Sequence, residues 1–427
     1  MADVRKDGRA GATGEDPAGL VDWSRLPSAQ APGQWAIRWH ATVLFLACLA
    51  VAPLAHCHRM ATATLPSERY VRAAAEWHWD GVMEGRWTTA VGTWLEKDNP
   101  AARALTGSWN DLRWRLGILQ NEQVHVGAKD WFYLRNSLAP SAERIESGAE
   151  SRRQVLEAVA ARTRRLGVHL VVMLVPDKER IYPEYAYADG QMPSPKHGLY
   201  ARIIDDLKLA GIPVVDVARV MHEARPAPGP GNLYYQRDTH WTVHGAFLAA
   251  QALRRHLEAS PFRDQLGREV LYAVPQPMVV SLMPDLVALC GLRTFETRLE
   301  GMGEPVLLPA SVVSSQLSES KQYWRLRTAA IDVRPGLPMD ALADEALVAL
   351  AGSSFSAENG KDAVAFALGR AVDGRGIHKG ASALQGLAET LDRMEQGESK
   401  ARVLVWEFVE RAWLEGVWTP PAGLLRH

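Results

Sequence analysis

The sequence contains little cysteine and no excess of either charge. Its 427 residues include three cysteines, 48 Lys and Arg together, and 49 Asp and Glu together, which gives a formal net charge of -1. A nucleic-acid-binding protein neutralises phosphates with a basic surface, and this chain has neither a basic run nor an RNA-binding signature. The balance of charge therefore argues against nucleic acid as a partner.

The cysteines also argue against several kinds of site. Cys48, Cys57 and Cys290 form no C-x-x-C pair, and no Cys/His cluster has the spacing of a zinc site. Two of the cysteines lie in or beside an apolar segment and the third stands alone, so no disulfide framework is implied. We expect neither a metal nor a cofactor.

One uncharged apolar run, at 41–55, lies between Arg38 and Arg59. With its polar flanks it reaches the about 20 residues that a membrane-spanning helix needs, and it starts too late for an ordinary cleaved signal peptide. We interpret 38–58 as an uncleaved transmembrane signal-anchor and 1–37, rich in Gly, Ala and Pro, as a disordered cytoplasmic tail. A buried globular helix over the same run is the alternative.

Helical periodicity dominates residues 59–120. Apolar residues recur at spacings of three and four, as in amphipathic helices, so we interpret this region as a helical lead-in to the rest of the chain. Several of the 15 tryptophans lie here: Trp77, Trp79, Trp87, Trp94, Trp109 and Trp114. Exposed indoles stack on sugar rings, but packing inside the protein is the role we expect for most of them.

Strands and helices alternate over 121–427, which predicts an α/β/α sandwich on a mostly parallel sheet. After a short hairpin at 124–134, the expected strands are apolar throughout, as strands covered on both faces are: 167–176, 212–217, 346–351 and 402–408. Helices are expected at 150–166, 200–209, 243–258, 360–370 and 381–394, with Thr242 as the N-cap of the third. No order of elements is predicted for 260–340.

Residues able to carry chemistry lie at the ends of these elements. Asp238 and His240 are two positions apart, so in an extended segment both point to one face, and the carboxylate can orient the imidazole and stabilise its cation. The strand at 346–351 leads into a Gly-Ser-Ser-Phe-Ser turn, which exposes a serine at the carboxyl edge of the sheet. Because a serine needs a positioned base, we predict a Ser354-His240-Asp238 triad.

Other interpretations of these residues stay open. Ser353 and Ser356 are the alternatives to Ser354 as the nucleophile. His240 and His244 lie four apart on one helical face and, with Asp238, could hold a metal ion. A third possibility is that His240 is only a hydrogen-bonded histidine near the start of a helix.

Five segments, in this order along the chain, resemble one family. Residues 234–242 contain Tyr-Tyr-x-x-Asp-Thr-His-Trp-Thr, which is similar to the signature of the alginate O-acetyltransferase family, the AlgJ/AlgX-like proteins with an SGNH-hydrolase-like domain. The other segments are 126–133, 175–184, 352–356 and 405–411, so the resemblance covers about 120–412. The sequence departs from the family at Met283-Pro284-Asp285-Leu286, where Gly-Asp-Leu is common.

The resemblance implies a function and a location. Such proteins lie in the periplasm, where they O-acetylate exopolysaccharides, and many are attached to the inner membrane by a single-pass anchor. A membrane-bound O-acyltransferase partner supplies the acetyl group. By resemblance, Ser354 is the acetylated nucleophile, His240 the base and Asp238 its orienting carboxylate, in an acetyltransferase domain over 121–427. A carbohydrate acetyl esterase with the same triad, and a non-catalytic glycan-binding or scaffold subunit of an acetylation complex, are the alternatives.

Three further residues are candidates for substrate contact. Lys178 lies at a predicted strand end, Tyr235 in the signature segment, and Arg375 in Asp373-Gly374-Arg375-Gly376, which we match to the Gly-rich loop of the family. A solvated turn lysine and a core tyrosine are the simpler interpretations of the first two.

Overall fold

The computed structural model describes residues 68–97, 100–119, 121–225, 232–272, 276–280, 284–292, 323–327, 329–330, 337–378, 383–415, 418–419 and 424. The predicted tail at 1–37 and signal-anchor at 38–58 lie outside these residues. Among the described helices, none has the length and apolar character that a membrane crossing requires. The chain divides into two compact units, 1–103 and 104–427.

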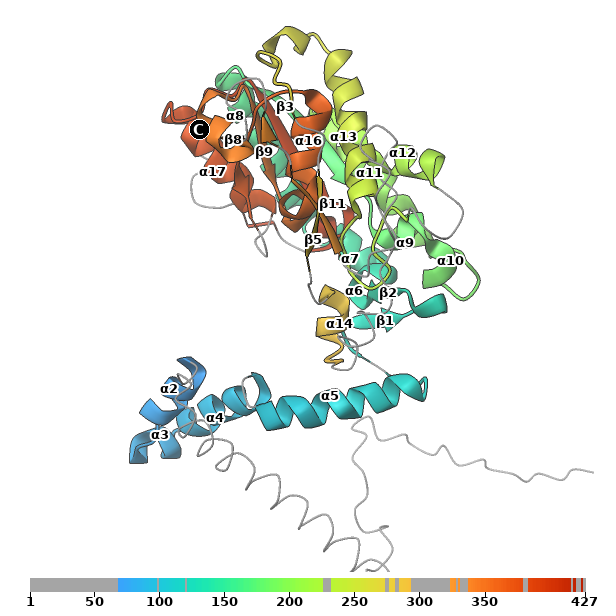
Figure 1. Cartoon of the computed structure of the whole chain (residues 1–427), viewed down its shortest axis with the longest axis vertical. Helices are drawn as coiled ribbons and strands as arrows, with labels where there is room; N and C mark the ends of the chain where they lie inside the picture. The colour runs from blue at the N-terminus through green and yellow to red at the C-terminus, as the bar shows by residue number, and fades with distance from the viewer. Residues whose placement is uncertain are drawn as a thin grey trace, which may run out of the picture. The chain divides into compact units, whose positions relative to one another are not determined.

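The larger unit is built on a five-stranded sheet, drawn in Figure 1. Its strand order is β10-β9-β11-β3-β4, and every neighbouring pair is parallel. The strands are β3 (His169–Val175), β4 (Val214–Asp216), β9 (Val348–Gly352), β10 (Val372–Ile377) and β11 (Val403–Val409). The predicted α/β fold with a parallel sheet is therefore confirmed, and four of its five strands lie where the apolar runs placed them.

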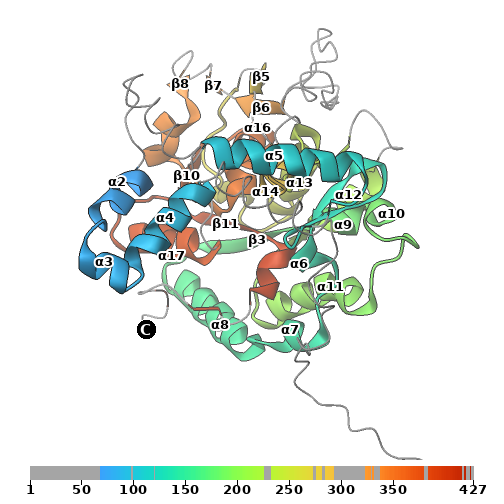
Figure 2. The same ribbon diagram turned by 90° about the horizontal axis from the view of Figure 1, so that it is seen from below.

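Helices cover both faces of the sheet, and alternate side chains of β3 pack into two different hydrophobic cores. Leu170, Val172 and Leu174 pack with α8 (Ala149–Arg165), α11 (Ser194–Leu209) and α17 (Ala383–Glu395). Val171, Met173 and Val175 pack with α12 (Val217–Ala224), α13 (Val243–Glu258) and α16 (Lys361–Leu368). Figure 2 shows these two helical layers on opposite sides of β3. Continuous apolar strands need this arrangement, since neither face meets water.

Strand β10 was not predicted, because its sequence reads as a glycine-rich loop. A Cβ added to Gly376 would lie 2.1 Å from Thr390 Oγ1 and 2.9 Å from the Gly386 carbonyl oxygen, and one on Gly386 would lie 2.0 Å from the Gly376 oxygen. The glycines therefore let α17 lie directly against the edge strand. The loop interpretation of Asp373-Gly374-Arg375-Gly376 is wrong: a close approach of two backbones, not a turn, accounts for Gly376.

A short hairpin precedes the sheet, as predicted. Strands β1 (Val124–Val126) and β2 (Phe132–Leu134) pair antiparallel around the turn η2 (Ala128–Asp130). Lys129 and Asp130 occupy the left-handed region, with φ of 53° and 59°. The Phe132 N–H donates to the Gln236 carbonyl oxygen at 2.9 Å, so the hairpin is tied to the segment that carries Asp238 and His240.

Four helices occupy the described part of the N-terminal region: α2 (Glu68–Ala75), α3 (Trp79–Met83), α4 (Arg86–Lys97) and α5 (Pro100–Arg115). The Trp77 and Trp87 rings lie 4.6 Å apart. However, Trp77, Trp79 and Trp109 are 66%, 76% and 58% exposed, so the packing role expected for tryptophan does not hold for these three.

The remaining helices are α6 (Arg135–Leu138), α7 (Ala142–Glu146), α9 (Lys178–Ile181), α10 (Pro183–Ala186), α14 (Asp285–Leu289), η3 (Arg263–Gln265), η4 (Met339–Glu345), η5 (Ser356–Gly360) and η6 (Glu410–Leu414). Two small antiparallel pairs lie apart from the main sheet: β5 (Gln276–Val280) with β6 (Tyr323–Arg327), and β7 (Ala329–Ala330) with β8 (Leu337–Pro338).

The contact between β10 and α17 predicts the effect of one methyl group. Gly376→Ala should lower the free energy of unfolding by about 1–3 kcal/mol, because the new Cβ overlaps Thr390 and Gly386. Gly198→Ala, in the exposed part of α11 with nothing within 4 Å, should instead raise it by about 0.5–1 kcal/mol. Urea unfolding followed by circular dichroism measures both, and equal effects of the two variants would contradict the packing argument.

Candidate active site

The predicted serine lies at the carboxyl edge of the sheet. Strand β9 ends at Gly352, Ser353 follows, and a helical stretch begins at Ser354 and continues through η5 into α16. Gly352 is needed here, because a Cβ would lie 2.6 Å from Ser356 Oγ and 2.7 Å from Glu407 Oε2. The strand therefore turns sharply into the helix, and Ser354 occupies the first helical position.

A single imidazole bridges Ser354 and Asp238. The Ser354 Oγ lies 2.8 Å from His240 Nε2, and His240 Nδ1 lies 2.6 Å from Asp238 Oδ1. The same carboxylate oxygen accepts the His240 backbone N–H at 2.9 Å. With Nδ1 protonated, the ring donates to Asp238 and accepts the serine proton at Nε2. This arrangement can move a proton from a serine hydroxyl to a histidine.

The histidine segment is held by a small ladder and by the serine helix. Tyr234 and Trp241 form an antiparallel bridge, and the Thr242 hydroxyl caps α13 by accepting from the Gly245 N–H. The Trp241 Nε1–H donates to the Phe355 carbonyl oxygen at 3.0 Å. Since Phe355 directly follows Ser354, this bond fixes the distance between the two halves of the site.

Lys178 supports the same segment from inside the protein. Its ammonium donates to the carbonyl oxygens of Tyr235, Gln236 and Asp238 at 3.1, 3.1 and 2.8 Å. Lys178 and Tyr235 are both buried, and the Tyr235 N–H donates to the His240 carbonyl oxygen at 3.1 Å. These contacts hold the loop that presents Asp238.

Glu407, on β11, accounts for the two neighbouring serines. Its carboxylate accepts the Ser353 N–H at 2.8 Å, the Ser353 hydroxyl at 3.0 Å and the Ser356 hydroxyl at 2.8 Å. Complete burial raises the pKa of Glu407, while these hydrogen bonds act in the opposite direction. Ser353 and Ser356 thus anchor the turn, and Ser354 is the serine of the three that faces His240.

A second carboxylate, Asp285 at the start of α14, also reaches the site. It accepts the Thr239 N–H at 2.8 Å and the Thr239 hydroxyl, and its Oδ2 lies 3.7 Å from His240 Nδ1. Its own N–H donates to Asp238 Oδ2 at 2.9 Å. Ligand atoms of Asp238, His240 and Asp285 lie within 4.8 Å of one another, whereas His244, the ligand expected in the metal interpretation, is not part of this group.

The charges around His240 favour its protonated form. Burial lowers the pKa of His240, but the hydrogen bond and charge of Asp238 and the charges of Asp285 and Glu358 outweigh it, so the pKa lies above the usual 6.5. Burial raises the pKa of Asp238, but its contacts with His240 and Asp285 lower it below its usual value. The pair is therefore suited to accept a proton at nitrogen and keep the carboxylate ionised.

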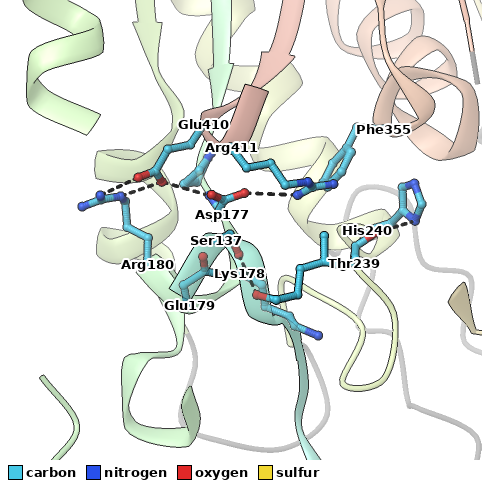
Figure 3. A network of polar contacts seen from close by, with 12 residues as sticks. Ser137, Asp177, Lys178, Glu179, Arg180, Thr239, His240, Phe355, Glu410 and Arg411 are labelled. Carbon is cyan, nitrogen blue, oxygen red and sulfur yellow. Dashed lines mark hydrogen bonds and ion pairs between the residues drawn. The ribbon is translucent and has the colours of Figure 1, made fainter. Parts of the chain in front are cut away.

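A cluster of three acids and three bases lies behind the site, partly drawn in Figure 3: the buried Asp177, Glu179, Arg180, Lys196 and Glu410, and the half-buried Arg411. Lys196 contacts Asp177 at 2.5 Å and Glu410 at 3.3 Å, which links the ends of β3 and β11 through α11. Arg411 contacts Asp177 at 3.1 Å and lies 5.3 Å from the centre of the Phe355 ring. The cluster thus extends to the residue beside Ser354.

Comparison with known proteins identifies the family of the chain. The family described as SGNH hydrolase-like domain, acetyltransferase AlgX, matches residues 124–410. The chain belongs to the AlgJ/AlgX family of SGNH hydrolase-like acetyltransferases. The resemblance seen in the sequence is thereby confirmed, and the protein is an O-acetyltransferase of this type.

Relatives of known name cover most of the chain. The probable alginate O-acetylase AlgJ of Pseudomonas fluorescens is 26% identical over 345 residues, which are 77% of this chain and 78% of that one. Its namesake in Pseudomonas aeruginosa is 25% identical over 344 residues, 77% of this chain and 80% of that one. The solved O-acetyltransferase domain of Pseudomonas putida AlgJ, 22% identical, has the same fold, with a TM-score of 0.53 over 70% of this chain and 96% of that domain.

Of the six residues singled out in the sequence, the structure of this AlgJ/AlgX family member brings three together: Ser354, His240 and Asp238. Arg375, on the edge strand β10, instead pairs with Asp373 of the same strand and with Asp344 of η4, with N–O distances of 2.9 Å. Lys178 lies under the loop that carries Asp238 and His240, and Tyr235 is a buried residue of that loop. Substrate contact by these last three residues stays a prediction.

Sequence reasoning missed the roles of Glu407 and Asp285. Both lie in segments that were compared with the family, Glu407 in the closing strand and Asp285 in the departure from Gly-Asp-Leu. Nothing local marks them, because each acts on residues about 50 positions away: Ser353 and Ser356 for Glu407, Thr239 and Asp238 for Asp285.

The contacts of His240 predict how the acetyltransferase activity depends on pH when His240 acts as the base. Only a neutral imidazole can take the Ser354 proton, so the rate should rise as pH increases through the pKa of His240, with a midpoint above 6.5. Asp238→Asn should move the midpoint to lower pH and reduce kcat by about 10³- to 10⁴-fold. Profiles of kcat/KM from pH 5 to 9 test this, and a flat profile would count against a histidine base.

Proposed function

We propose that this protein acetylates hydroxyl groups of an exopolysaccharide of the alginate type, through an acetyl ester on Ser354. The observation that carries the proposal is the chain of short contacts from Ser354 through His240 to Asp238, at 2.8 and 2.6 Å. The alginate O-acetylases named among the relatives support the choice of polymer.

In the first step, Ser354 Oγ attacks the carbonyl carbon of the acetyl donor while His240 Nε2 takes the hydroxyl proton. The bond between the acetyl carbonyl carbon and the leaving group of the donor breaks, and His240 returns the proton to that leaving group. Asp238 keeps the ring oriented and stabilises its cation. Ser354 occupies the first position of a helical stretch, and its own backbone N–H can stabilise the oxyanion. The neighbouring Ser353 and Phe355 N–H groups donate to Glu407 and to Ser353 Oγ instead.

In the second step, a sugar hydroxyl replaces the donor. His240 takes the proton of that hydroxyl as its oxygen attacks the ester on Ser354, and then protonates Ser354 Oγ as the serine leaves. The acetyl group ends on the polymer and the triad is restored. No net proton is gained or lost.

We place this reaction in the periplasm, at the inner membrane. The apolar run at 41–55 supports a single-pass anchor over 38–58, which would leave the helical lead-in at 59–120 and the domain at 121–427 on the periplasmic side. A membrane-bound O-acyltransferase is the expected partner that supplies the acetyl group.

A covalent label tests the nucleophile. Incubation with an activated acetyl ester should add one acetyl group to the peptide that contains Ser354, as seen by mass spectrometry. Ser354→Ala should lose the label and at least about 10³-fold of the activity. Ser353→Ala and Ser356→Ala are matched controls, and both should keep the label because their hydroxyls face Glu407. Full activity of Ser354→Ala would refute the acetyl-serine.

An esterase would use the same acyl-enzyme, so the acceptor decides between the two reactions. With uronate oligosaccharides present, acetyl transfer should exceed release of free acetate, and His240→Ala should abolish both. Release of acetate with no acetylated sugar would favour the esterase. Polymer acetylation that survives His240→Ala would favour a non-catalytic glycan-binding subunit.

A further inference from the structure

Asp285 is fixed in place by packing that is independent of the triad. The apolar side of α14 is buried among side chains of the hairpin and its own segment: Val124, Phe132, Leu286, Val287, Cys290 and Leu292. The Asn110 and Asn121 side-chain amides donate to the Cys290 and Leu289 carbonyl oxygens, both at 3.0 Å. The helix therefore presents Asp285 from a rigid support.

The contacts of Asp285 converge on the residues that hold His240. Its carboxylate accepts both donors of Thr239, the residue between Asp238 and His240, and its N–H donates to the Asp238 oxygen that His240 does not use. Asp285 thus holds two successive residues, Asp238 and Thr239, through its side chain and its backbone N–H. Nothing in a Ser-His-Asp triad requires this second carboxylate.

The sign of the local charge gives Asp285 a second effect. The acidic groups Asp238, Asp285 and Glu358 raise the pKa of His240 against the effect of burial. Burial and the charge of Asp238 raise the pKa of Asp285 itself, His240 and Thr239 act in the opposite direction, and Asp285 also interacts with Arg411. Arg411, on the neighbouring Phe355 ring, is paired with Asp177. When His240 takes the Ser354 proton, the cation therefore forms beside two carboxylates, at 2.6 and 3.7 Å.

We propose that Asp285 is a positioning residue of the acyl-transfer reaction, which holds Asp238 and Thr239 in register and stabilises the His240 cation by its charge. This inference rests on the proposed function of the triad. It assigns to Asp285 a role beside the imidazole rather than in the polymer site.

The charge effect is measured on His240 itself, without turnover. In the full chain with Ser354→Ala, the His240 ring is titrated by NMR with ¹³C-labelled histidine, and His240→Gln assigns its signal. Asp285→Asn should lower the midpoint by at least about 0.8 pH unit, the effect of one charge at 3.7 Å in a water-like dielectric. Asp285→Glu should stay nearer to the parent value, because the charge is kept.

Glu389→Gln is the matched control, since Glu389, on α17, lies 2.6 Å from a different histidine, His378. It should leave the His240 midpoint unchanged. An Asp285→Asn shift no larger than that of the control would overturn the charge effect, whether or not the enzyme acetylates Ser354.

The positioning effect is measured by turnover with Ser354 present. Asp285→Asn should move the acid limb of kcat/KM to lower pH and reduce the high-pH plateau by about ten- to 10²-fold. A plateau within twofold of the parent enzyme would overturn the positioning role. Absence of acetyl-Ser354 in the parent enzyme would instead refute the proposed function, so the two failures are distinct.

Discussion

The structure depends on one hydrogen-bonded imidazole that joins segments 114 residues apart. His240 reaches Ser354 only because the loop before α13 and the turn after β9 meet at the same edge of the sheet. Each segment is held by a separate buried group: Lys178 binds three carbonyl oxygens of the histidine loop, and Glu407 binds the two serines beside Ser354. The Trp241–Phe355 hydrogen bond then fixes the distance between them.

These supports are charged groups removed from water, and their burial carries a large cost in desolvation free energy. Replacement of a buried ion pair by apolar side chains is often neutral or stabilising, whereas loss of one partner costs about 3–5 kcal/mol. The six-residue cluster around Lys196 is therefore better explained by geometry than by stability. Directional contacts join the ends of β3 and β11 and reach Phe355, so the strand ends that surround Ser354 cannot shift independently.

The sequence predicted those parts of the molecule that are determined locally. Strands β3, β9 and β11 are continuous apolar runs, Thr242 is a standard N-cap, and Asp238, His240 and Ser354 lie at element ends with recognisable neighbours. Strand β10 was missed because its Gly376 is required by the close packing of α17, and such a tertiary contact leaves no periodic pattern in the sequence. Glu407 and Asp285 were missed for the same reason, since a single acidic residue carries no sign of a distant partner.

The use of both ring nitrogens of His240 also bears on the type of chemistry. Asp238, His240 and Asp285 have the ligand types and spacing of a metal site, yet Nδ1 is bound to Asp238 and Nε2 to Ser354. A metal ion at Nδ1 would displace the proton from that nitrogen. The proton of the neutral ring would then be on Nε2, which could no longer accept the proton of Ser354. In the proposed reaction, the proton that His240 takes from Ser354 supplies the positive charge beside these two carboxylates, so the acyl transfer that we propose uses no metal ion at this place.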